Sequence, residues 1–193
     1  MRVALLSAGP SLRGSFAPVA AAMDLPGPRK HHAPGARPYD LVIGVNTAVE
    51  YFACDWWSCA DAHRFEEIKP NCIGRPSLFM LAPERDKLMR RCPEQLAEHD
   101  VVGWDEIFAK VDADPKWQNW SAPSALVLAR HLGARSIDCY GVDLVGGVDC
   151  TGKACCHRNP GRWEREAELW QTIVNWLWCK YRVPVDRINP CRV

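Results

Sequence analysis

The 193-residue sequence lacks several features that would place it in a functional class at once. It has no apolar run close to the ~20 residues that span a bilayer, so no transmembrane helix is predicted. Its 24 Lys and Arg residues nearly balance 23 Asp and Glu residues, so composition requires neither a nucleic acid nor a membrane as partner. Met1 leads directly into an apolar segment without a secretory signal pattern, and we therefore expect a cytoplasmic protein.

Paired Cys-x-x-Cys units are also absent, although the chain contains ten cysteines. Without paired spacing or a secretory signal, reduced thiols are favoured over a disulfide framework. Cys150, Cys155, Cys156 and His157 place four soft ligands within eight residues, which would suit zinc. Their spacing differs from common structural zinc sites, so we favour a mobile Cys-rich loop over residues 144–160 without a metal.

Short apolar runs alternate with helical patterns along the rest of the chain. Apolar runs predict strands at 3–6, 39–45, 55–60, 76–81, 101–102 and 136–142, with a further edge strand within 183–193. Helical patterns cover 13–23, 47–53, 84–91, 121–132 and 162–181, whereas the Pro- and Gly-rich residues 24–38 are typical of an exposed loop. This alternation predicts an α/β fold: a single Rossmann-like domain over residues 1–193, with a mostly parallel sheet covered by helices on both faces.

The turn after the first strand is the strongest local candidate for an anion site. Ser7, Ala8 and Gly9 are small enough to let another molecule approach the backbone, and Pro10 suits the first turn of a helix opened by Ser11. Such a helix start offers N–H groups and a positive dipole end to a phosphate or carboxylate. The segment is neither a full G-x-G-x-x-G nor a P-loop, so an ordinary tight turn remains the alternative.

Polar residues also follow the other predicted strands. Asn46 follows the second, Asp61 and His63 the third, and Asp143 the strand near residue 140, while Ser121 opens an apolar helix. The carboxyl ends of parallel strands lie at one edge of a sheet, where ligands of open α/β folds bind. We therefore expect these residues to border one ligand-binding crevice.

Several short motifs, in their order, resemble the bacterial sialyltransferase-like proteins. The motifs are residues 8–12 (AGPSL), 44–46 (GVN), 57–61 (WSCAD), 121–123 (SAP), 129–134 (ARHLGA) and 140–143 (YGVD). Motility-accessory-factor glycosyltransferases and the 6-hydroxymethylpterin pyrophosphokinase-like family share this outline. The resemblance spans residues 2 to 144, and Asn189-Pro190 is similar to the tail of these families.

The resemblance implies a Rossmann-like domain that binds a nucleotide, often a CMP-activated sugar. Residue by residue, it places Gly9, Pro10 and Ser11 by the phosphate, Asn46 at the ribose or base, and Ser121 at the phosphate, with the Gly141 to Asp143 turn bordering the nucleotide. The sequence departs from the pattern at three positions: Ala8 and Asp61 each stand where the family has Asn, and Ala122 where it has Gly. An added carboxylate near a phosphate favours a bound metal or another nucleotide over CMP-sialic acid.

Three function classes remain open at this point. The first is a nucleotide-sugar-dependent, glycosyltransferase-like enzyme, small enough to be phage-encoded, with His157 as the base and His63 as the alternative. The second is a pyrophosphokinase-like enzyme in which Asp61 and Asp143 hold Mg²⁺ against the donor phosphates. The third is a non-catalytic nucleotide-binding or interaction protein.

Overall fold

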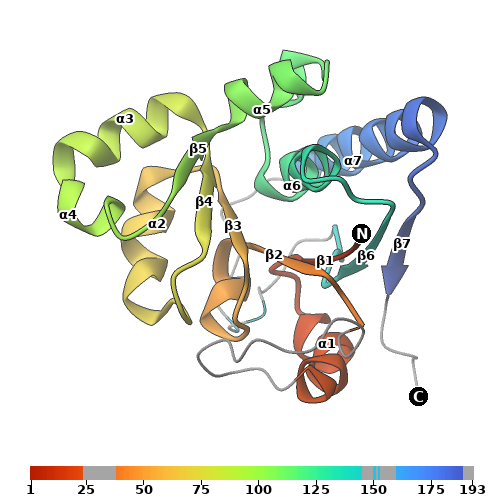
Figure 1. Cartoon of the computed structure of the whole chain (residues 1–193), viewed down its shortest axis with the longest axis horizontal. Helices are drawn as coiled ribbons and strands as arrows, with labels where there is room; N and C mark the ends of the chain where they lie inside the picture. Colours follow the sequence, from red (N-terminus) through yellow and green to blue (C-terminus); the bar gives the residue numbers. More distant parts are fainter. Residues whose placement is uncertain (24–37, 145–149, 151, 153–159, 189–193) are drawn as a thin grey trace.

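A computed structural model describes residues 1–23, 38–144, 150, 152 and 160–188 of the chain. Its centre is a parallel sheet of seven strands, in the spatial order β5-β4-β3-β2-β1-β6-β7 (Figure 1). The strands are β1 (Arg2–Leu6), β2 (Leu41–Val45), β3 (Trp56–Cys59), β4 (Ser77–Met80), β5 (Val101–Gly103), β6 (Ser136–Tyr140) and β7 (Val185–Ile188). Every strand pair is parallel, which confirms the predicted α/β class.

The direction of chain progression reverses at β1. From β1 the chain adds β2 to β5 on one side, then crosses the sheet to place β6 and β7 on the other. At the carboxyl end of β1, Leu6 pairs with Gly44 of β2 and with Tyr140 of β6. The turns after β1 and β6 therefore meet at a topological switch point, the usual ligand position in open α/β sheets.

Helices cover both faces of the sheet (Figure 1). One face carries α1 (Leu12–Ala22), α2 (Ala62–Ile68), α3 (Ala82–Arg91) and α4 (Pro93–Leu96), with the 3-10 turns η1 (Asn46–Glu50) and η2 (Lys69–Asn71). The other carries α5 (Trp104–Lys110), η3 (Pro115–Trp117), α6 (Ser121–His131) and α7 (Pro160–Tyr181). Among the described residues, no helix is both long and apolar enough to cross a membrane.

Alternate side chains of β1 are buried in two separate hydrophobic cores, one on each face of the sheet. Val3 and Leu5 belong to the core that α5, α6 and α7 complete, whereas Ala4 and Leu6 belong to the core that α1 and α2 complete. Because successive side chains of a strand point to opposite faces, an unbroken apolar run is needed when helices cover both. This two-sided burial explains why the first strand has no polar alternation.

Helices α6 and α7 closely match the helical patterns in the sequence. Residues 121–129 of α6 are all buried, and Gly133, with φ +93°, follows its end in the left-handed conformation that glycine favours. Helix α7 buries Trp170, Ile173 and Leu177 against the sheet. The predicted edge strand is also present, as β7, parallel to β6.

Candidate functional site

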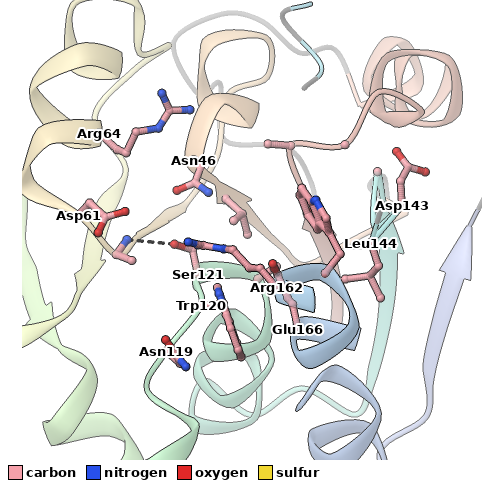
Figure 2. Close-up of a pocket in the computed structure, with 18 of the residues that line it drawn as sticks. Asn46, Asp61, Arg64, Asn119, Trp120, Ser121, Asp143, Leu144, Arg162 and Glu166 are labelled. Atoms are coloured by element: carbon pink, nitrogen blue, oxygen red, sulfur yellow. Dashed lines mark hydrogen bonds between the residues drawn. The ribbon is translucent and has the colours of Figure 1, made fainter. Parts of the chain in front are cut away.

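A cavity of about 320 Å³ lies at the carboxyl ends of β3, β2, β1 and β6, beside the switch point. It is closed by residues 118–120 and by the starts of α6 and α7 (Figure 2). Its volume falls within the range of about 300–1,000 Å³ that small-molecule sites occupy. Of the predicted site residues that the structure describes, all except Ser11 and His63 line it: Ala8, Gly9, Pro10, Asn46, Asp61, Ser121, Gly141 and Asp143.

The close backbone approach at Gly9 is to the chain itself. The Gly9 N–H donates to the Gly141 carbonyl oxygen at 2.9 Å. A Cβ atom on Gly9 would lie 2.2 Å from that oxygen and 2.3 Å from Asp143 Oδ2. The small residue that we expected to make room for a ligand is thus required to join the turns after β1 and β6.

The start of α1 is likewise occupied from within the protein. The Ser11 N–H donates to Asp143 Oδ2 at 2.9 Å, while the Ser11 hydroxyl makes no capping bond. Helix α1 begins at Leu12, so Pro10 precedes the N-cap residue instead of lying in the first turn. A carboxylate is stabilising at the positive end of a helix, and here Asp143 supplies it. Ser11 itself does not line the cavity.

Asn46 projects into the cavity from the end of β2 (Figure 2). Its backbone has φ +48°, in the left-handed region that asparagine tolerates better than most residues. This conformation marks the transition from β2 into η1 and sets the direction of the amide. The amide can both donate and accept, so it suits a ribose hydroxyl or a base edge.

Ser121 ties the start of α6 to the end of β3. Its Oγ accepts a hydrogen bond from the Ala60 N–H at 3.0 Å (Figure 2), and the Ser58 hydroxyl donates to the Ser121 carbonyl oxygen at 2.9 Å. Ser121 is the first residue of α6, and Trp120 holds the N-cap position before it. The two bonds hold the positive end of α6 against the cavity.

Asp61 and His63 diverge after β3. Asp61 is exposed and lines the cavity, and it makes no capping bond to α2 although it holds the N-cap position. The Ala62 N–H is satisfied instead by Glu84 Oε2 at 3.1 Å. His63 lines a separate surface hollow with Glu84, Arg90 and Arg91. The alternative base is therefore not among the side chains that border the cavity.

His157, Cys155 and Cys156 lie outside the described residues, as does nearly all of the predicted loops 24–38 and 144–160. Cys150, the described member of the cysteine cluster, is buried, with its Sγ 3.6 Å from Thr47 Oγ1. Its N–H donates to the Ala8 carbonyl oxygen at 2.8 Å. Cys150 thereby fixes the chain beside the turn after β1.

Asp61 and Asp143 lie at opposite ends of the cavity (Figure 2). They follow β3 and β6, which are three strand spacings apart. At about 4.8 Å per spacing, that separation is roughly 14 Å. Within the described ranges, no three His, Cys, Asp or Glu side chains come close enough together to hold a metal ion. One Mg²⁺ between these two carboxylates would need both within about 2.1 Å of the ion, a geometry that the fold does not provide.

The sequence interpretation missed three charged residues of the cavity. They are Arg64 from α2, and Arg162 and Glu166 from the start of α7. Glu166 is only 7% exposed and lies four residues before Trp170, which is buried on the same helix. A carboxylate is rarely buried without a partner, so Glu166 on the buried face of this helix is the sequence feature that points to the start of α7 as part of a site.

Cys59, the last residue of β3, does not provide a nucleophile. Its Sγ lies 3.5 Å from the Asp61 carbonyl oxygen, and burial raises the pKa of the thiol to about 12. The thiolate is the nucleophilic form, so a buried thiol of this kind is unreactive near neutral pH. Among the described lining residues, the side-chain groups available for chemistry include hydroxyl, amide, carboxylate and guanidinium groups.

Comparison with known proteins gives a likeness in fold. No family profile and no curated protein sequence matches the chain. The sialyltransferase CST-II, solved with a trisaccharide acceptor and CMP, superposes with a TM-score of 0.57 at 12% identity, over 99% of this chain and 82% of that one. CstII from Campylobacter jejuni, in complex with the substrate analogue CMP-3FNeuAc, gives a TM-score of 0.56 at 13% identity, over 98% and 81%.

This chain shares the sialyltransferase fold. The structural likeness agrees with the sialyltransferase-like part of the sequence resemblance, and nothing in it points to the pyrophosphokinase-like or motility-factor families. At such low identity the likeness extends to the fold alone. What the protein binds must be argued from the cavity.

Proposed function

We propose that this protein is a glycosyltransferase-like enzyme that binds a nucleotide or nucleotide-sugar donor in the cavity and transfers a group to a hydroxyl acceptor. The observation that carries the proposal is the position of the cavity. It lies at the switch point, between the Asn46 amide and the positive end of α6, with two arginines on its lining. The fold shared with CST-II, which was solved with CMP, supports the same class of donor.

The proposed reaction is a displacement at the anomeric carbon of a donor sugar. The acceptor oxygen attacks that carbon, the bond from carbon to the phosphate oxygen breaks, and the phosphate leaves with the electron pair. The positive end of α6 and a guanidinium group would stabilise the charge that develops on the leaving phosphate. A base takes the proton of the acceptor hydroxyl.

Two groups are proposed for this base. His157 is our first choice, on the strength of the family resemblance. Asp61, exposed at one end of the cavity, is the second. His63 now ranks below both, because its side chain borders a different hollow.

Binding and turnover test the proposal in two steps. Calorimetric titration with CMP, UMP, AMP and GMP is expected to give one preferred nucleotide, and Asn46→Ala should weaken its binding about tenfold by removing an amide that bonds the ligand. Sugars activated by that nucleotide are then assayed for nucleotide release. His157→Ala should abolish release and preserve binding, whereas His63→Ala, the matched control, should change neither.

Each contrary result has a distinct meaning. A protein that binds none of the four nucleotides would refute the proposal. Binding without release from any donor would favour a non-catalytic nucleotide-binding protein.

A further inference from the structure

The turn after β1 is a poor place for the phosphate of a donor. The helix start there already receives a carboxylate, because the Ser11 N–H donates to Asp143 Oδ2. The Gly9 N–H is also used, by the Gly141 carbonyl oxygen. A phosphate at this turn would meet like charge on Asp143, and it would find both backbone donors engaged.

The opposite wall of the cavity carries positive groups, Arg162 and the start of α6, beside one carboxylate, Glu166. Arg162 lies in the first turn of α7, and its side chain reaches into the middle of the cavity and points toward Ser121 (Figure 2). Ser121 is the first residue of α6, whose positive end faces the same space. A guanidinium group and a helix start on one wall suit the negatively charged oxygens of a phosphate group.

Arg64, the second arginine of the lining, is less suited to this role. Figure 2 shows its guanidinium on the far side of Asn46 from Ser121. The central position belongs to Arg162.

We infer that Arg162, from the first turn of α7, binds the phosphate of the donor nucleotide beside the start of α6, and that the turn after β1 does not. This inference rests on the proposed function and assigns a ligand group within that site. It also gives α7 a functional part, because its first turn carries the phosphate ligand while its later turns pack against the sheet.

The contribution of the phosphate alone provides the test. Calorimetry compares CMP with cytidine, and each other monophosphate of the panel with its own nucleoside, so that the ratio of the two affinities isolates the phosphate. In the parent we expect the monophosphate to bind roughly 10- to 100-fold more tightly, as for one or two charged hydrogen bonds. Arg162→Gln should reduce that ratio to near one and leave nucleoside affinity unchanged, and Arg162→Lys should retain part of it.

Arg165→Gln is the matched control. Arg165 lies on the same helix but is exposed and does not line the cavity. Its replacement removes the same charge from α7 and should leave the ratio at the parent value. Equal losses in both variants would mean that only the general charge of α7 matters, and would overturn the assignment.

A second measurement uses the unaltered protein, in case Arg162→Gln does not fold. Phenylglyoxal modifies accessible arginines, and mass spectrometry locates the modified positions. The preferred monophosphate should protect Arg162, whereas its nucleoside should not. Equal modification with both would refute the inference. A parent that binds neither compound refutes the proposed function itself, so the two failures are distinguishable.

Discussion

The two walls of the cavity are built in different ways. On the wall formed by the turns after β1 and β6, the protein's own groups satisfy the backbone donors. The Gly9 N–H donates to the Gly141 carbonyl oxygen, the Cys150 N–H to the Ala8 carbonyl oxygen, and the Ser11 N–H to the Asp143 carboxylate. On the wall formed by α6 and α7, charged and polar side chains project into the cavity from helix starts. The first wall therefore holds the sheet together where the chain reverses, and the second is the one equipped to bind an anion.

The largest expected effect is that of Gly9→Ala, which tests the structural role of the first wall. The new Cβ would clash with the Gly141 carbonyl oxygen and with Asp143, so we expect a loss of about 3 kcal/mol in the free energy of unfolding. Urea denaturation measures it.

Gly14→Ala is the matched control, because Gly14 is exposed within α1. Alanine is the better helix former there, so this variant should gain up to about 1 kcal/mol. A Gly9→Ala protein of parental stability that no longer binds nucleotide would show instead that Gly9 makes room for a ligand.

A smaller effect is expected for Asp143→Asn. The substitution removes the negative charge from the start of α1 but keeps an oxygen that can accept from the Ser11 N–H. We expect stability to fall by about 1 kcal/mol, as for a charge at a helix end. Removing a negative charge beside the cavity should leave nucleotide affinity equal to that of the parent or slightly higher. A tenfold loss of nucleotide affinity in a folded variant would show that Asp143 contacts the ligand. The wall formed by the turns after β1 and β6 would then bind the nucleotide as well.

The smallest effect is expected from divalent metal. Asp61 and Asp143 follow strands about 14 Å apart, so one divalent ion cannot contact both carboxylates at once. Calorimetric titrations of the preferred nucleotide with Mg²⁺ or with EDTA, on the parent and on Asp61→Asn, should agree within about twofold. Affinity that depends on Mg²⁺ in the parent and not in the variant would restore the metal-assisted alternative.

Much of the fold could be read from local patterns. The apolar runs at 3–6 and 136–142 became β1 and β6, and the apolar helix beginning at Ser121 became α6. The short helices α4 and α5 were not predicted, because segments of four to seven residues carry too little periodicity. Polar residues at strand ends also anticipated which residues would share a cavity, since parallel strands present their carboxyl ends together.

The sequence by itself thus determined the order of strands and helices and the edge of the sheet at which polar groups gather, because both follow from spacing along the chain. Only the tertiary structure decided what those groups contact. Asp143 accepts from the N–H of Ser11, 132 positions away, and Arg162 enters the cavity from a helix that no local pattern connected with the site. His63 turned away although it stands two residues from Asp61. Such contacts depend on the crossover that brings β6 beside β1 and on the direction in which each turn leaves its strand, and no local pattern encodes either.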